Sequence, residues 1–78
     1  MKTLEQIIEK ENTRRNENGM YGIQACKESI LSSLEIDKKY GKETSLFTYL
    51  EKFVKRANED VFFNDAMVLA CWELINNK

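Results

Sequence analysis

The residues of this sequence that could take part in catalysis are two cysteines, scattered carboxylates and a pair of adjacent arginines. The chain contains no His, which excludes imidazole catalysis and His ligation of a metal. Cys26 and Cys71 are the only cysteines. Without His they lack a base that would activate a thiol, and two thiols cannot complete a zinc site. Because both lie among apolar positions, we interpret them as small, reduced core residues.

Asp65 is the one carboxylate set in an apolar stretch, between Asn64 and Ala66. A carboxylate beside buried aromatic rings could act as an acid or a base. We favour a structural role, in which Asp65 stabilises the positive N-terminal end of a helix. No nucleophile, metal ligand set or phosphate loop accompanies it, and residues 19–22 lack the neighbours of a phosphate-binding motif. We therefore expect no enzyme activity, no cofactor and no metal.

The composition is that of one small globular domain. The chain has 78 residues, of which 42% are hydrophobic and 32% charged, and its net charge is -1. A folded monomer of this length should expose roughly 4,900 Å² of surface. The near-neutral charge argues against a strongly basic nucleic-acid clamp. We also expect a cytoplasmic protein without a membrane segment, because no secretory signal is visible and the longest apolar run, residues 66–72, is too short to span a bilayer.

Helical periodicity predicts an all-α fold, a compact bundle of about four helices in a single domain over residues 1–78. The first helix should begin after Thr3, which has capping-box spacing to Gln6. A polar segment, 11–19, should be solvated and lie between this helix and the rest. The second helix is expected over 22–40 with Gly41 as its C′ residue, and the third over 44–59. The third has an apolar arc of about 120°, made of Leu46, Phe47, Leu50, Phe53, Val54 and Ala57.

The last helix, expected from about residue 60 to 75, is apolar on two sides. One side is an ordinary core face. The other carries a second stripe of Val61, Val68, Trp72 and Ile75. A helix that is apolar all round must be buried all round, so either it is the central helix of the bundle or the second stripe is an interface. We place these four residues in a partner interface, and a homodimer would bury such a patch most simply.

Arg14 and Arg15 are further candidates for partner binding. Adjacent arginines can hold phosphate or carboxylate groups by bidentate contacts. However, residues 1–19 carry four positive and four negative side chains, and surface ion pairs of this kind are usually weak. We therefore favour a solvated arm over a binding arm.

Binding to DNA is the alternative function. The second helix, the turn at 40–43 and the third helix can be aligned with a helix-turn-helix whose recognition helix is 44–59. That segment has a net charge of only +1, and Asp37 stands where a small residue would let the two helices cross closely.

The sequence thus favours a non-catalytic protein-binding module. By analogy with short chains that lack a catalytic set, including those of phages and mobile elements, it would be a small adaptor, inhibitor or regulator. It would act in the cytoplasm through an apolar surface of the C-terminal helix, on a protein partner or on itself.

Overall fold

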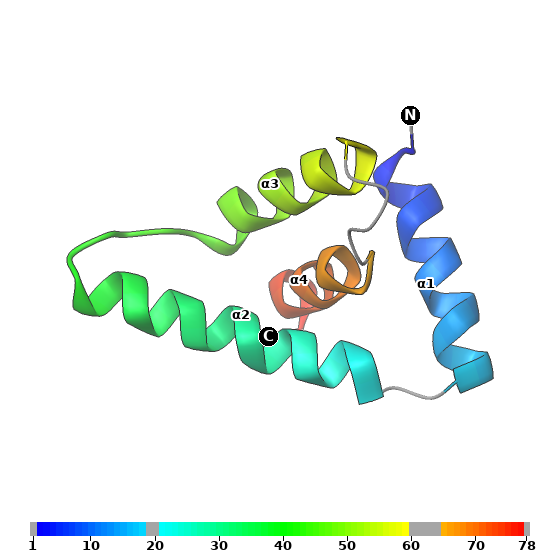
Figure 1. Ribbon diagram of the computed structural model, residues 1–78, viewed down its shortest axis with the longest axis horizontal. Helices are drawn as coiled ribbons and strands as arrows, with labels where there is room; N and C mark the ends of the chain where they lie inside the picture. The colour runs from blue at the N-terminus through cyan, green and yellow to red at the C-terminus, as the bar shows by residue number, and fades with distance from the viewer. Residues whose placement is uncertain (1, 19–20, 60–64, 78) are drawn as a thin grey trace.

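The computed structural model describes residues 2–18, 21–59 and 65–77, and these residues form four α-helices without a strand (Figure 1). The helices are α1 (Leu4–Asn18), α2 (Tyr21–Lys39), α3 (Leu46–Glu59) and α4 (Ala66–Asn76). The predicted all-α fold of about four helices is confirmed. The start expected for the last helix, at residue 60 or 61, lies outside the described residues.

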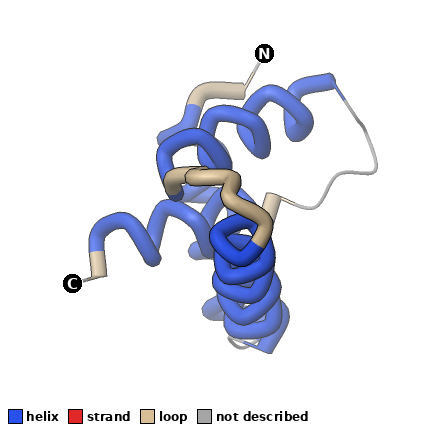
Figure 2. The backbone as a smooth tube through the Cα atoms, turned by 90° about the vertical axis from the view of Figure 1, so that its left-hand side faces the viewer, coloured by secondary structure: helices blue, strands red, loops and turns tan. Residues whose placement is uncertain are grey.

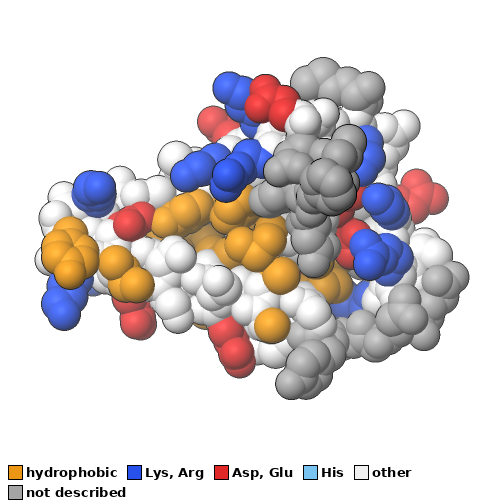
Figure 3. Space-filling view, in the orientation of Figure 1, with side chains coloured by type: hydrophobic (Ala, Val, Ile, Leu, Met, Phe, Trp, Pro, Cys, Tyr) orange, Lys and Arg blue, Asp and Glu red, His pale blue; other side chains and the backbone are white. Residues whose placement is uncertain are grey.

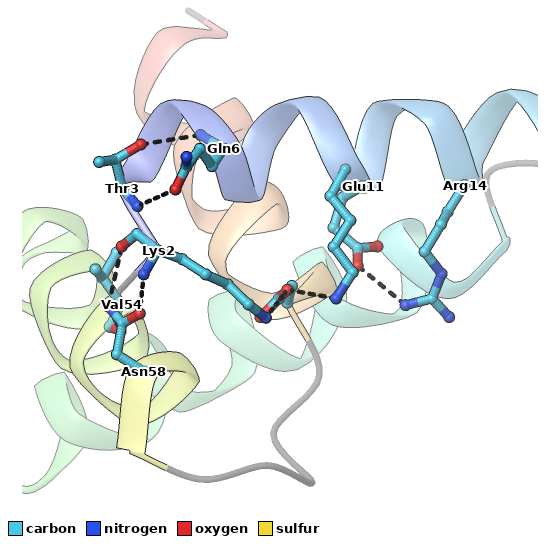
Figure 4. Close-up of polar contacts among 9 residues, drawn as sticks. Lys2, Thr3, Gln6, Glu11, Arg14, Val54 and Asn58 are labelled. Atoms are coloured by element: carbon cyan, nitrogen blue, oxygen red, sulfur yellow. Dashed lines mark hydrogen bonds and ion pairs between the residues drawn. The ribbon is translucent and has the colours of Figure 1, made fainter.

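The first helix begins with the predicted capping box. The backbone N–H of Gln6 donates to Thr3 Oγ1 at 3.3 Å, and the backbone N–H of Thr3 donates to Gln6 Oε1 at 3.0 Å (Figure 4). The helix then continues without interruption to Asn18. Residues 11–18, the described part of the segment predicted to be polar and solvated, are therefore the second half of this helix. Glu11, only 3% exposed, follows the buried Ile7 by one turn on the same face.

The second helix ends in the way that its glycine predicts. The backbone N–H of Gly41 donates to the carbonyl oxygen of Lys38 at 3.1 Å. The backbone N–H of Lys42 donates to the carbonyl oxygen of Asp37 at 2.7 Å. These two bonds are the Schellman motif, in which the C′ residue adopts a left-handed conformation. Gly41 has a φ of 77°. The next helix, α3, is capped by Ser45, whose Oγ accepts the backbone N–H of Thr48 at 3.2 Å.

The most apolar helix, α4, lies at the centre of the bundle. It packs against α1, α2 and α3, whereas α2 and α3 contact each other little. Figure 1 shows α4 nearly end-on between them. Val68, Leu69, Ala70 and Cys71 are all buried, with at most 1% exposed. The sequence left two alternatives for this helix, a central position or an interface on its second stripe. The first half of α4 occupies the central position. Its C-terminal end extends outward from the other helices (Figure 2).

The bundle is more open than a monomer of this length requires. Its accessible surface is 5773 Å², which exceeds the expected value by roughly 850 Å². Its radius of gyration is 12.5 Å, against about 11.5 Å for a typical domain of 78 residues. One cause is visible in Figure 1, where α2 extends well past α4. On the face that Figure 3 shows, hydrophobic side chains gather between α2 and α3, beside Lys and Arg side chains.

Replacing Gly41 by Ala should destabilise the fold through the backbone alone, because a Cβ at this position would meet no atom within 4 Å. A left-handed conformation costs an L-residue about 1 to 2 kcal/mol, and urea denaturation should show that loss. The control is Gly22→Ala, which also has open space around it but lies within α2. In this control the free energy of unfolding should rise by about 0.5 kcal/mol. Equal effects of the two substitutions would contradict a cap that depends on the backbone of Gly41.

Candidate protein-binding surface

The second apolar stripe of the last helix is divided by the packing of the bundle. Val68 is 0% exposed and belongs to the core, so it cannot form part of a surface. The sequence placed it in a partner interface because periodicity alone does not reveal how many neighbours enclose a helix. Trp72 and Ile75 are half-buried and pack against the edge of the core. Val61 lies outside the described residues. Only Trp72 and Ile75 therefore remain candidates on α4.

The exposed end of α4 lies beside the start of α3. The Sγ atom of Cys71 donates to the carbonyl oxygen of Leu46 at 3.2 Å. Ile75 follows Cys71 by one helical turn on the same side of α4, so it lies near the same junction. On another side of the end of α4 is an open hollow of about 240 Å³, lined by Trp72, Glu73, Asn76 and Asn77.

One flank of α3 is apolar and open to solvent. Phe47 is 62% exposed, although the sequence assigned it to the core arc. Farther along α3 is an apolar groove of about 370 Å³, whose walls come from Leu4 of α1 and from Leu50 and Val54 of α3, with Glu51, Lys55 and Asn58 at its rim. Phe47 and Val54 stand at one edge of the predicted arc, and that position was the signal for an exposed flank. We call Phe47, Trp72 and Ile75, together with this groove, the α3–α4 surface.

The two candidate arginines are engaged within the chain. Arg15 Nη2 donates to both carboxylate oxygens of Glu73, at 2.7 and 3.0 Å, and Lys27 Nζ lies 3.7 Å from the same carboxylate. Arg14 Nη1 donates to the buried Glu11 at 3.1 Å (Figure 4). The sequence could not assign the partner of Arg15, because Glu73 is 58 residues away. Arg15 therefore attaches α1 to α4, whereas the exposed Arg14 contacts Glu11 within α1, and its binding of a partner stays a prediction.

Asp65 connects three segments of the chain through ion pairs. Its side chain is 2% exposed, and Oδ2 accepts hydrogen bonds from Lys2 Nζ at 3.1 Å and from Lys10 Nζ at 3.2 Å. The hydrogen bond to Asp65 is the main cause that raises the pKa of Lys2. The backbone of Lys2 is also held, since its N–H donates to Asn58 Oδ1 at 2.7 Å (Figure 4). Asp65 thus connects the N-terminal residues and α1 to the start of α4, as a structural group.

The cysteines have no feature of a reactive site. Both are free thiols, and burial raises the pKa of Cys71 to about 11. Burial, with a smaller contribution from the negative charge of Glu11, also raises the pKa of Cys26. A raised pKa lowers the fraction of thiolate, which is the nucleophilic form. No group of three or more potential metal ligands occurs within residues 2–18, 21–59 and 65–77.

The contact between α2 and α3 differs from that of a helix-turn-helix. In that motif two helices pack directly on each other across a turn of three or four residues. Here six residues separate α2 from α3, and α4 lies between much of their length. Asp37 instead links α2 to α3, because its carboxylate accepts a hydrogen bond from the Tyr49 hydroxyl at 2.5 Å. This hydrogen bond lowers the pKa of Asp37 and raises that of Tyr49. The arrangement of α2 and α3 is therefore not that of a helix-turn-helix.

Comparison with known proteins adds no assignment. No family model matches the chain, and neither the curated proteins nor the solved structures include a significant match. Among the described residues, no helix is both long and apolar enough to cross a membrane.

Replacing Arg15 by Met should destabilise the fold, because Glu73 would keep only its longer contact with Lys27. We expect the free energy of unfolding to fall by about 1.5 to 3 kcal/mol, the range for hydrogen bonds to charged groups. The control is Arg56→Met, at an exposed position of α3, which should change stability by less than about 0.5 kcal/mol. Equal stability of Arg15→Met and the wild type in urea would show that Arg15 does not hold α1 in place.

The two thiols should differ in their reaction with iodoacetamide. At pH 8 the native protein should be alkylated at the half-buried Cys26 before the fully buried Cys71, and denaturation should equalise the rates. The folded state holds the Cys71 proton more tightly than the unfolded state does. The contribution of the protonated Cys71 thiol to the free energy of unfolding is therefore complete below pH 9, and it is lost as the pH rises towards 11. Peptide mapping by mass spectrometry measures both rates. Equal native rates would be inconsistent with the burial of Cys71.

Proposed function

We propose that the chain is a non-catalytic protein-binding module that acts through the α3–α4 surface. The observation that supports this proposal most is the uneven burial of α4. Most of its first half is buried, whereas Trp72 and Ile75 at its other end are only partly buried, and Phe47 on α3 is 62% exposed. The single chain leaves apolar surface of these three side chains in contact with water, and a protein partner would cover it.

The residue types at this surface are those that interfaces prefer. Aromatic residues are enriched where proteins meet and provide much of the binding energy, and charged residues are depleted from the centre of interfaces. The surface contains Phe47 and Trp72, the one tryptophan of the chain. The nearby carboxylate of Glu73 is already neutralised by Arg15 and Lys27. A partner could therefore cover Trp72 without desolvating an unpaired charge.

The cellular role that we propose is that of a small adaptor, inhibitor or regulator in the cytoplasm. The described residues offer no catalytic set to support a reaction, and the exposed side chain of Phe47 is available for contact. Such a protein would act by occupying or joining other proteins.

Site-specific photo-crosslinking tests the surface. Benzoylphenylalanine would be placed at position 47, 72 or 40, and each variant irradiated in an extract of the organism that encodes the chain. We expect protein adducts from positions 47 and 72, because a bound partner covers them. Position 40 is the matched control, since Tyr40 is an aromatic residue that is 74% exposed in the turn directly after α2. Mass spectrometry identifies the adducts. Equal yields at all three positions, or none at 47 and 72, would refute the proposal.

A further inference from the structure

We infer that Lys2, Lys10 and Arg14 form a second binding site, which takes a carboxylate from an acidic segment of a protein partner. We call these three residues the cationic row. They lie on α1 and on the residues that precede it, and none of them belongs to the α3–α4 surface. The inference goes beyond the proposed function, because it gives the chain a second contact that depends on charge rather than on apolar cover.

Each cation of the row is anchored on a buried carboxylate. Lys2 Nζ and Lys10 Nζ lie 3.1 and 3.2 Å from the same oxygen, Asp65 Oδ2. Arg14 Nη1 lies 3.1 Å from Glu11 Oε1 (Figure 4). These contacts hold the three charged groups in place before a ligand arrives. Binding therefore does not have to order long side chains that are free to move, which is a cost that preorganisation removes.

The cations are accessible, whereas their carboxylates are not. The side chains of Lys2, Lys10 and Arg14 are 44%, 51% and 55% exposed, and those of the anchoring carboxylates are only 2% and 4% exposed. An ammonium group has three N–H donors and a guanidinium group five, so the anchors use only a part of them. The outer layer of the site is therefore positive, although negative charges lie beneath it.

The charges of the site leave a surplus that one further anion would balance. Three cations stand against two carboxylates, Asp65 and Glu11. A single carboxylate from a ligand would make the numbers equal. Arg15 and Lys27 have the same surplus over Glu73, but their side chains are only 19% and 14% exposed. Of these two clusters, the cationic row is the one that a ligand reaches from solvent.

The acidic side chains of α1 are kept away from the row. Lys10 and Arg14 are four residues apart, so they lie on one face of the helix, about 6 Å apart along its axis. Glu5 and Glu9 are the exposed acidic residues among positions 4–16. They lie roughly 100° to 180° around the helix axis from the two cations. A ligand that approaches this face of residues 4–16 therefore meets no exposed carboxylate.

An acidic protein segment fits the row better than a nucleic acid does. Proteins that bind single strands place aromatic side chains for base stacking beside the cations that contact phosphates. No residue of α1 is aromatic, and a chain with a net charge of -1 attracts polyanions weakly. An acidic peptide needs no stacking surface, and the guanidinium of Arg14 suits the planar geometry of a carboxylate.

Titration of the isotope-labelled full chain with hexaglutamate, followed by NMR at low ionic strength, tests the site. Amide signals around Lys10 and Arg14 should move first, and Lys10→Gln should raise the dissociation constant roughly two- to fivefold, as for one exposed ion pair. The matched control, Lys39→Gln, removes the same charge from the exposed end of α2, which Figure 1 shows far from α1. It should leave binding unchanged. Equal weakening by both variants, or no shift around the row, would overturn the inference.

Asp65→Asn distinguishes a binding role from a structural one. The amide oxygen of Asn still accepts hydrogen bonds from Lys2 and Lys10, but the buried negative charge is lost and the positive surplus of the row increases. Hexaglutamate should therefore bind more tightly than it binds the wild type, a gain that the loss of a structural contact would not produce. Circular dichroism shows that the variant is folded. Unchanged or weaker binding by the folded variant would contradict the site.

Single-stranded hexathymidylate tests the class of partner. It carries a similar number of negative charges on phosphates instead of carboxylates. We expect it to bind the wild-type chain more weakly than hexaglutamate does under the same conditions. Equal or tighter binding of hexathymidylate at the row would overturn the assignment to an acidic protein segment.

Discussion

The enclosure of α4 is the constraint on which the rest of the structure depends. A helix with apolar side chains on all sides is stable in water only if neighbours surround it, and here three helices supply that cover. Since α2 and α3 both pack on α4, they are held apart from each other and cannot form a pair of their own. The three helices do not enclose the C-terminal end of α4. The three short helices cover Trp72 and Ile75 only in part, so the candidate surface follows from the same constraint as the core.

Charged contacts complete the attachment of α1. Ile7 is its one fully buried apolar residue, and the next turn of the same face is occupied by Glu11. Ion pairs supplement the few apolar contacts: Arg15 binds Glu73 and Lys10 binds Asp65, while Arg14 binds the buried Glu11 within α1. Buried charges are stable only when their partners are correctly placed. The position of α1 is therefore set by a few specific pairs, whereas α2 and α3 are held by broader apolar contact.

Local features of the structure could be predicted from the sequence, and long-range ones only in part. The Thr3 capping box and the Gly41 terminus depend on residues within one turn, so their spacing was sufficient. The composition of α4 left its central position as one of two alternatives, and the other was chosen for its second stripe. The position of Phe47 at the edge of its arc was a signal for exposure, whereas the burial of Val68 could not be derived, because it depends on how far each neighbour extends. The partners of Arg15 and Asp65 are also invisible in a single sequence, since they lie 58 and at least 55 residues away.

The Asp65 cluster has a consequence for the order in which the chain folds. Its bonds to Lys10 and Lys2 join residues 55 and 63 positions apart, so they close loops that include nearly the whole chain. The entropy lost in closing a loop grows with its length, and contacts between distant residues slow folding. The capped ends of α1 and α2 can form within single segments. We therefore expect the docking of α1 on the start of α4 to come late, after α2, α3 and α4 have assembled.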